Sequence, residues 1–120
     1  MGTVLIVDDV QTDRELVGKV VTGAGHVPVF ATDGDEALTK AREFAPELIF
    51  MDVVMPRMNG FNACRALKKD PGTEKIPVVL LTTKGAESDR FWGMKQGASE
   101  HIAKPFTPES LAAVIRRYVR

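Results

Sequence analysis

Short apolar runs alternate with longer amphipathic segments along the whole chain. Four continuous apolar runs and one shorter mixed segment have the length and residue types of β-strands. These predicted strands are Val4–Val7, Val27–Ala31, Leu48–Met51, Val78–Leu81 and Glu100–Ala103. Because consecutive positions in the runs are apolar, we expect strands buried on both faces, as in a parallel sheet covered by helices.

Between the predicted strands, apolar residues recur with the three- and four-residue spacing of an α-helix. The first such segment has its apolar face at Leu16, Val17, Val20 and Val21. The other predicted helices are Glu36–Phe44, Phe61–Lys69, Arg90–Gln96 and Thr107–Tyr118. In the second helix the residues expected to face the core are Ala37, Leu38, Ala41 and Phe44. Strands that alternate with helices in this way predict an α/β fold with a doubly wound parallel sheet.

The size and charge of the chain narrow the possible functions. At 120 residues, one domain spanning residues 1–120 is expected, with no second domain after the last helix. Sixteen basic residues balance sixteen acidic ones, which argues against direct nucleic-acid binding as the main role. The single cysteine, Cys64, suits a reducing compartment and is expected to be a half-buried helix residue. No signal segment or membrane-length apolar run is found, so a soluble, cytoplasmic protein is expected.

Polar side chains with chemical potential follow four of the five predicted strands. In an open α/β sheet, binding sites form beyond the carboxyl ends of the strands. The side chains at these positions are Asp8 and Asp9 after the first strand, Asp52 after the third, Thr82 and Thr83 after the fourth, and Lys104 after the fifth. We therefore expect three carboxylates, a hydroxyl group and an ammonium group to meet at one edge of the sheet.

This combination has a chemical interpretation that its members lack individually. A lone Asp after a strand is often a helix cap, and a lone Thr or Lys there is usually an ordinary surface residue. Three neighbouring carboxylates, however, repel one another unless a cation neutralises them, and their oxygens suit Mg²⁺. A carboxylate can also accept a phosphoryl group, whose oxygens Mg²⁺ and a lysine would stabilise.

The motifs that contain these residues resemble the receiver domains of two-component response regulators, including the stand-alone chemotaxis type. They are LIVDD at Leu5–Asp9, LIFMDVVMPRMNG at Leu48–Gly60, PVVLLTT at Pro77–Thr83 and KPF at Lys104–Phe106. The spacing between the motifs matches as well, so the resemblance covers essentially the whole chain. It implies a flavodoxin-like fold with a five-stranded parallel sheet in the order 2-1-3-4-5.

The resemblance also implies a role for each acid. Asp52 would be the phospho-acceptor, and Asp8 and Asp9 would hold Mg²⁺ together with Asp52. The backbone carbonyl of Val54 would complete the set of protein ligands to the metal.

Two further residues receive roles on the same basis. Thr82 would be the switch hydroxyl that moves toward the phosphoryl group, and it is chosen over Thr83 because its distance to Lys104 fits the family. Lys104 would contact the phosphoryl group. The peptide bond before Pro105 would be cis, as X-Pro bonds sometimes are.

Three residues are candidates for the switch and output surface. His101 stands where many members carry a Tyr or Phe that swings inward, and a histidine can also titrate near neutral pH. The segment Arg90–Gly97 is similar to that of stand-alone regulators in pilus-based (twitching) chemosensory systems. Phe91 and Trp92 are adjacent, so one helix cannot bury both equally. One is expected in the core, and the other is either part of a partner-facing surface or an isolated exposed aromatic.

The implied function is a phosphorelay switch rather than an enzyme acting on separate substrates. A sensor histidine kinase would phosphorylate Asp52, and the protein would then change its affinity for a downstream protein target or serve as a phosphate sink. A non-phosphorylated pseudo-receiver acting as a constitutive binding module is the alternative, and it predicts missing acids or a missing lysine. A flavin- or nucleotide-binding protein would need a glycine-rich loop where this chain has Asp8 and Asp9. An aspartyl phosphatase would be expected to have a cap domain and a longer chain.

Overall fold

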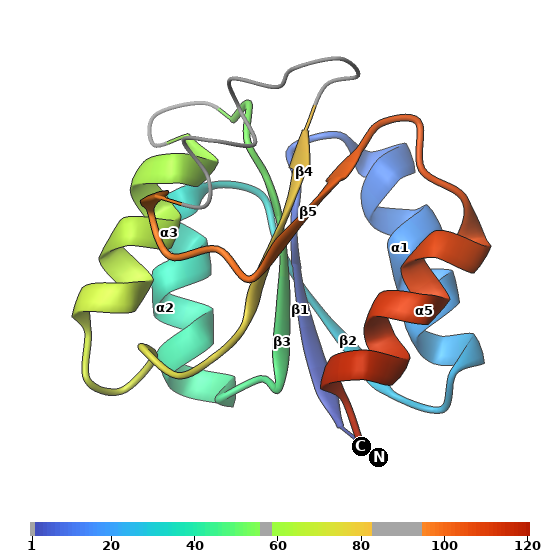
Figure 1. Cartoon of the computed structure of the whole chain (residues 1–120), viewed down its shortest axis with the longest axis horizontal. Coiled ribbons are helices and arrows are strands. Elements are labelled where there is room, and N and C mark those ends of the chain that lie inside the picture. Colours follow the sequence, from blue (N-terminus) through green and yellow to red (C-terminus); the bar gives the residue numbers. More distant parts are fainter. Residues whose placement is uncertain (1, 56–58, 83–94) are drawn as a thin grey trace.

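The sheet determines where every candidate residue lies. The computed structural model describes residues 2–55, 59–82 and 95–120. Five parallel strands form one sheet in the order β2-β1-β3-β4-β5 (Figure 1). They are β1 (Thr3–Val7), β2 (Val27–Ala31), β3 (Leu48–Asp52), β4 (Val78–Thr82) and β5 (Glu100–Ala103). The predicted fold class and strand order are confirmed.

Helices cover both faces of the sheet, as a parallel sheet requires. On one face lie α1 (Gln11–Gly23) and α5 (Pro108–Tyr118), and on the other lie α2 (Gly34–Phe44) and α3 (Gly60–Lys69) (Figure 1). The predicted helix Arg90–Gln96 falls almost entirely outside the described residues. No helix in the described part of the chain is long and apolar enough to cross a membrane.

Alternate residues of each strand serve two separate cores. Val4 and Ile6 of β1 pack with α1 and α5, whereas Leu5 and Val7 pack with α2 and α3. Successive strand side chains point to opposite faces, so a continuous apolar run supplies both layers. Every residue of β3 and β4 is buried, so the side chains at the ends of these two strands are largely shielded from solvent.

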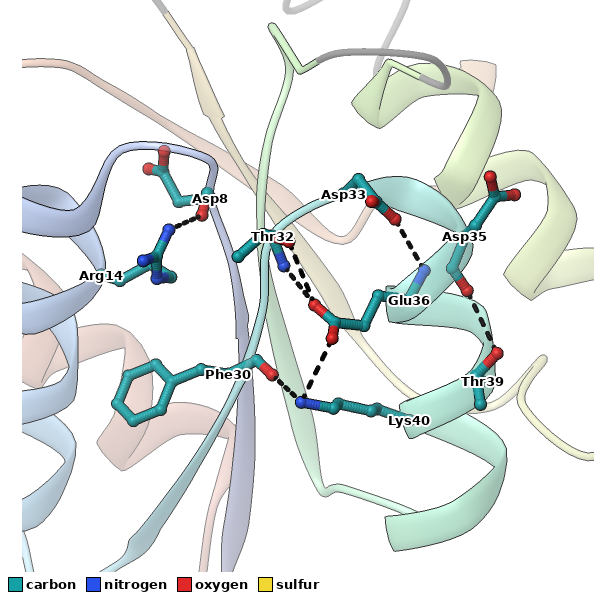
Figure 2. A network of polar contacts seen from close by, with 9 residues as sticks. All are labelled: Asp8, Arg14, Phe30, Thr32, Asp33, Asp35, Glu36, Thr39 and Lys40. Atoms are coloured by element: carbon teal, nitrogen blue, oxygen red, sulfur yellow. Dashed lines mark hydrogen bonds and ion pairs between the residues drawn. The ribbon is translucent and has the colours of Figure 1, made fainter.

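Side chains cap the starts of α2, α3 and α5, whereas α1 follows Val10 without a side-chain cap. Thr107 caps α5 and shares a capping box with Ser110. Asp33 accepts a hydrogen bond from the Glu36 N–H (2.8 Å) and starts α2 two residues earlier than predicted (Figure 2). Asn59 caps α3 in the same way, so this helix begins at Gly60.

Two predictions about burial need correction. Phe44 is 46% exposed and does not face the core, because it is the last residue of α2 and lies beyond Ala41, the last buried residue of this helix. Helical spacing reports the face on which a side chain lies but not where along the helix its packed neighbours end.

Cys64 is fully buried rather than half-buried, and burial raises the pKa of its thiol to about 11, with Lys68 opposing this shift. A thiol with a raised pKa is a poor nucleophile.

Candidate functional site

The carboxyl ends of the strands lie together at the edge of the sheet opposite the chain termini (Figure 1). Strand register brings specific residues to this edge: Val7 pairs with Met51, Asp52 with Leu81, and Thr82 with Ala103. The residue after β1 and the last residues of β3 and β4 therefore reach the same level. Parallel pairing alone accounts for the convergence of side chains that are far apart in sequence.

Three carboxylates form a compact group at this edge. Asp8, Asp9 and Asp52 each offer one oxygen, and these oxygens lie within 4.8 Å of one another. Asp8 is fully buried and Asp52 is 6% exposed, whereas Asp9 is exposed. Carboxylate oxygens are hard ligands, and Mg²⁺ is usually held by one or two carboxylates together with water or phosphate oxygens. The donor set therefore fits a small divalent cation with an open side toward solvent.

Asp8 is held in place by its own backbone and by the start of α1. Its N–H donates to the Ala31 carbonyl (3.1 Å), and its carboxylate accepts a hydrogen bond from the Val10 N–H (3.0 Å). The guanidinium group of Arg14 donates to the Asp8 carbonyl oxygen at 2.7 Å (Figure 2). With its main chain and side chain both engaged, Asp8 has a well-defined position.

Lys104 brings the balancing positive charge from the other end of the chain. Its Nζ lies 2.9 Å from a carboxylate oxygen of Asp13, 3.2 Å from Asp8 and 3.3 Å from Asp52. Its own N–H donates to the Thr82 carbonyl (2.6 Å), and the Lys104–Pro105 peptide bond is cis. Although burial lowers it, the hydrogen bond to Asp13 and the charges of Asp8 and Asp52 raise the pKa of Lys104 above its usual value. The ammonium group is charged at any physiological pH.

Asp52 is the acid whose ionisation the site perturbs most clearly. Burial and the neighbouring Asp8 raise its pKa from 3.8 to about 6, and Lys104 opposes this shift. A buried carboxylate beside another carboxylate resists ionisation unless positive charge arrives. Near neutral pH the ionised form of Asp52 consequently costs free energy, because it is buried and lies beside Asp8, and a bound cation would reduce this cost.

This perturbation predicts a stabilising substitution. The folded-state pKa of Asp52 is raised from 3.8 to about 6. The bound proton therefore stabilises the folded protein fully below about pH 4, and this stabilisation is lost as pH rises through about 6. Asp52→Asn removes the ionisation and is expected to increase the free energy of unfolding of the metal-free protein by about 2 kcal/mol at neutral pH. Urea denaturation in a chelator at about pH 4.5 and about pH 7.5 measures the difference.

The exposed Glu43→Gln on α2 is the matched control, with the same kind of change and no expected dependence on the site. A stability difference between Asp52→Asn and the wild type that stays constant across this pH range would contradict the assignment of the shift to Asp52.

Three of the remaining predicted residues fall within the described part of the chain. Thr82 is the buried last residue of β4, and His101 is a half-buried residue of β5. Val54 lies two residues beyond Asp52 and is 67% exposed. Phe91 and Trp92 fall outside the described residues. The roles of all five in metal binding, switching and output remain predictions.

Sequence reasoning missed two residues that shape the site. Asp13 makes the shortest of the three contacts to Lys104, although it is not part of a strand-end motif. Gly60 allows the start of α3 to lie against the strand end, since a Cβ there would fall 2.3 Å from the Asp52 carbonyl oxygen. An acid in the first turn of α1 and the glycine after Asn59 are visible in the sequence. Their partners are defined only by the packing of helices against the sheet.

A hollow of about 400 Å³ lies between α1, β2 and α2, and none of the strand-end acids lines it. Its cations are already paired, since Lys40 donates to the Phe30 carbonyl and pairs with Glu36, and Arg14 donates to Asp8 (Figure 2). The acids at the strand ends are therefore the better candidate for function.

Comparison with known proteins agrees with this geometry. The family described as response regulator receiver domain matches residues 4–116. Protein PilH of Pseudomonas aeruginosa is 40% identical over 115 residues, which cover 96% of this chain and 95% of PilH. The solved structure of the chemotaxis protein CheY4 of Vibrio cholerae superposes with a TM-score of 0.92 at 34% identity and covers 99% of both chains.

Longer relatives match over part of their length. The DNA-binding response regulator MtrA of Mycobacterium tuberculosis is 38% identical over 117 residues, which cover 98% of this chain but 50% of MtrA. The chain thus spans about half the length of such relatives. The family match, the fold and the identity to PilH agree with one another: the chain belongs to the response regulator receiver domain family.

Proposed function

We propose that this receiver domain is a phosphorylation-driven switch in which Asp52 accepts a phosphoryl group from a sensor histidine kinase. The observation that carries the proposal is the buried Asp52 at the end of β3, with two further acids and Lys104 around it. In the transfer, an Asp52 carboxylate oxygen forms a bond to phosphorus as the bond from phosphorus to the donor nitrogen breaks. The product is an aspartyl-phosphate and a free histidine on the kinase.

The surrounding residues would make this transfer possible. Asp8 and Asp9, with Asp52 and the Val54 carbonyl, would hold Mg²⁺, in keeping with an acidic pocket that binds this ion in receiver domains. Bound Mg²⁺ would neutralise charge on the phosphoryl oxygens. Lys104, whose Nζ already lies 3.3 Å from Asp52, would donate to a phosphoryl oxygen.

The response would spread from the ends of β4 and β5. The Thr82 hydroxyl would move toward the phosphoryl group, and the hydrogen bond from the Lys104 N–H to the Thr82 carbonyl already joins these two strand ends. A two-state protein shifts only as far as its ligand prefers one state, and contacts to the phosphoryl group would provide that preference. His101, Phe91 and Trp92 are the proposed switch and output residues.

The partners follow from the family. Receiver domains are signalling modules rather than enzymes acting on separate substrates, and they work with histidine kinases and downstream targets. Similarity to PilH and to CheY4 supports a stand-alone chemotaxis-type regulator of a pilus (twitching) system that acts on a protein target or as a phosphate sink. A single domain over residues 1–120 remains a prediction.

Intact-mass spectrometry after incubation with acetyl phosphate and Mg²⁺ tests the proposal. We expect the wild type to gain one phosphoryl group, and this gain to disappear in a chelator and in Asp52→Asn. Beryllofluoride binding distinguishes a short-lived aspartyl-phosphate from an acceptor that does not react. If the wild type gives no adduct and does not bind beryllofluoride, the proposal fails and the constitutive binding module replaces it.

A further inference from the structure

Among the described residues, Asp13 is the carboxylate partner of Lys104 that lies outside the group of acids able to hold a metal. Lys104 contacts three carboxylates, and two of them, Asp8 and Asp52, belong to that group. Asp13 lies in the first turn of α1 and makes the shortest contact, 2.9 Å from its Oδ2 to the lysine Nζ. Lys104 donates hydrogen bonds to Asp8 and Asp13, and Asp52 lies within ion-pair distance of the same ammonium group, at 3.3 Å.

Metal binding and phosphorylation would change the three contacts unequally. Asp8 and Asp52 would turn their oxygens to Mg²⁺, and Asp52 would carry the phosphoryl group. Asp13 would keep its full negative charge and its contact with Lys104. The ammonium group would then be shared between Asp13 and a phosphoryl oxygen, and a contact strengthened on one side would be weakened on the other.

The two partners also differ in how firmly they are placed. Asp13 lies on a helix anchored by buried Val17, Gly18 and Val21, whereas Lys104 reaches the site on a flexible four-carbon stem. Asp13 therefore determines much of the position of the ammonium group, and Lys104 adjusts to it. The Asp13 side chain is 31% exposed and that of Lys104 is 24% exposed, so water weakens the pair only in part.

We propose that Asp13 is a positioning residue that competes with the phosphoryl group for Lys104 and so makes the phosphorylated state less stable. This inference rests on the proposed function, because it concerns the lysine contact within that reaction. It assigns to α1 a direct influence on how long the signal lasts. In the contacts of the described residues, Asp13 is joined to Asp8 and Asp52 only through Lys104.

Beryllofluoride, a mimic of the phosphoryl group, provides a binding measurement that is separate from phosphorylation. Isothermal titration with saturating Mg²⁺ compares the wild type with Asp13→Asn, and we expect about three- to tenfold tighter binding in the variant. Glu15→Gln is the matched control: it removes an exposed charge from the same helix, where Glu15 pairs with Gln11. Its affinity is expected to stay within about twofold of the wild type.

A second pair of variants separates competition for the lysine from a general effect of charge. In a Lys104→Met background, adding Asp13→Asn is expected to change the affinity by less than about twofold. Lys104→Gln provides a second background if the first folds poorly. Equal tightening with and without the lysine would show that Asp13 acts through its charge alone and would overturn the proposal.

The remaining outcomes are also decisive. Unchanged or weaker binding by Asp13→Asn, while the wild type binds beryllofluoride, overturns this inference and leaves the proposed function standing. A wild type that does not bind beryllofluoride in the presence of Mg²⁺ overturns the proposed function, and the inference falls with it.

Discussion

Lys104→Met is expected to lower the free energy of unfolding of the metal-free protein by about 3 kcal/mol near neutral pH. The ammonium group lies within 3.3 Å of carboxylate oxygens of Asp8, Asp13 and Asp52, and two of these acids are buried. Removing one partner of a buried ion pair leaves the other charge without compensation. Methionine keeps the apolar stem of the lysine, so the loss reports mainly the charge.

Magnesium should reverse part of this loss, because it neutralises the same carboxylates. Urea denaturation of Lys104→Met with and without Mg²⁺ measures both effects, and the variant is expected to gain more stability from the ion than the wild type does. Lys19→Met, an exposed change of the same kind on α1, should unfold within about 0.5 kcal/mol of the wild type. If Lys104→Met is as stable as Lys19→Met in a chelator, the ammonium group does not stabilise the resting site.

Gly60→Ala is expected to destabilise the protein by about 3 kcal/mol and to weaken Mg²⁺ binding. A Cβ at this position would meet the Asp52 carbonyl oxygen at 2.3 Å and the Val53 Cα at 2.8 Å. Both are backbone atoms, which cannot rotate away as a flexible side chain would. Relief of the clash requires either α3 or the end of β3 to move, and the Asp52 carboxylate moves with that strand end.

Gly23→Ala on α1 is the matched control for this substitution. No atom lies within 4 Å of a Cβ built at Gly23, so the change should be neutral or stabilise the helix by up to about 1 kcal/mol. Thermal or urea denaturation compares the two variants, and titration calorimetry with Mg²⁺ reports the site. A Gly60→Ala protein as stable as Gly23→Ala would show that α3 has room to retreat from β3.

The strands were readable from the sequence because a strand buried on both faces is apolar at every position. Leu48–Met51 and Val78–Leu81 show this pattern, and the polar residues directly after them correctly marked the edge where the acids meet. Local patterns sufficed because each strand end is a local feature, and parallel pairing brings such ends together.

Features that depend on packing between elements were not readable in the same way. The exposure of Phe44 depends on where the neighbours of α2 end, and the Asp13 contact depends on how α1 approaches the end of β5. Gly60 could be recognised as a loop or cap residue, but its contact with the Asp52 backbone requires α3 and β3 to be placed together. Contacts between separate helices and strands produce no periodic pattern in the sequence.

The hydrogen bond from Lys104 to Asp8 joins residues 96 positions apart, so the site closes residues 8–104 into one loop. Contacts between residues this distant in sequence carry a large loop-closure entropy cost, so they are expected to form late in folding. During synthesis, the acids near the start of the chain emerge long before the lysine that balances them. A nascent chain that stops short of β5 would thus hold the acids without their counter-charge, and the site would be complete only once β5 and Lys104 have been synthesised.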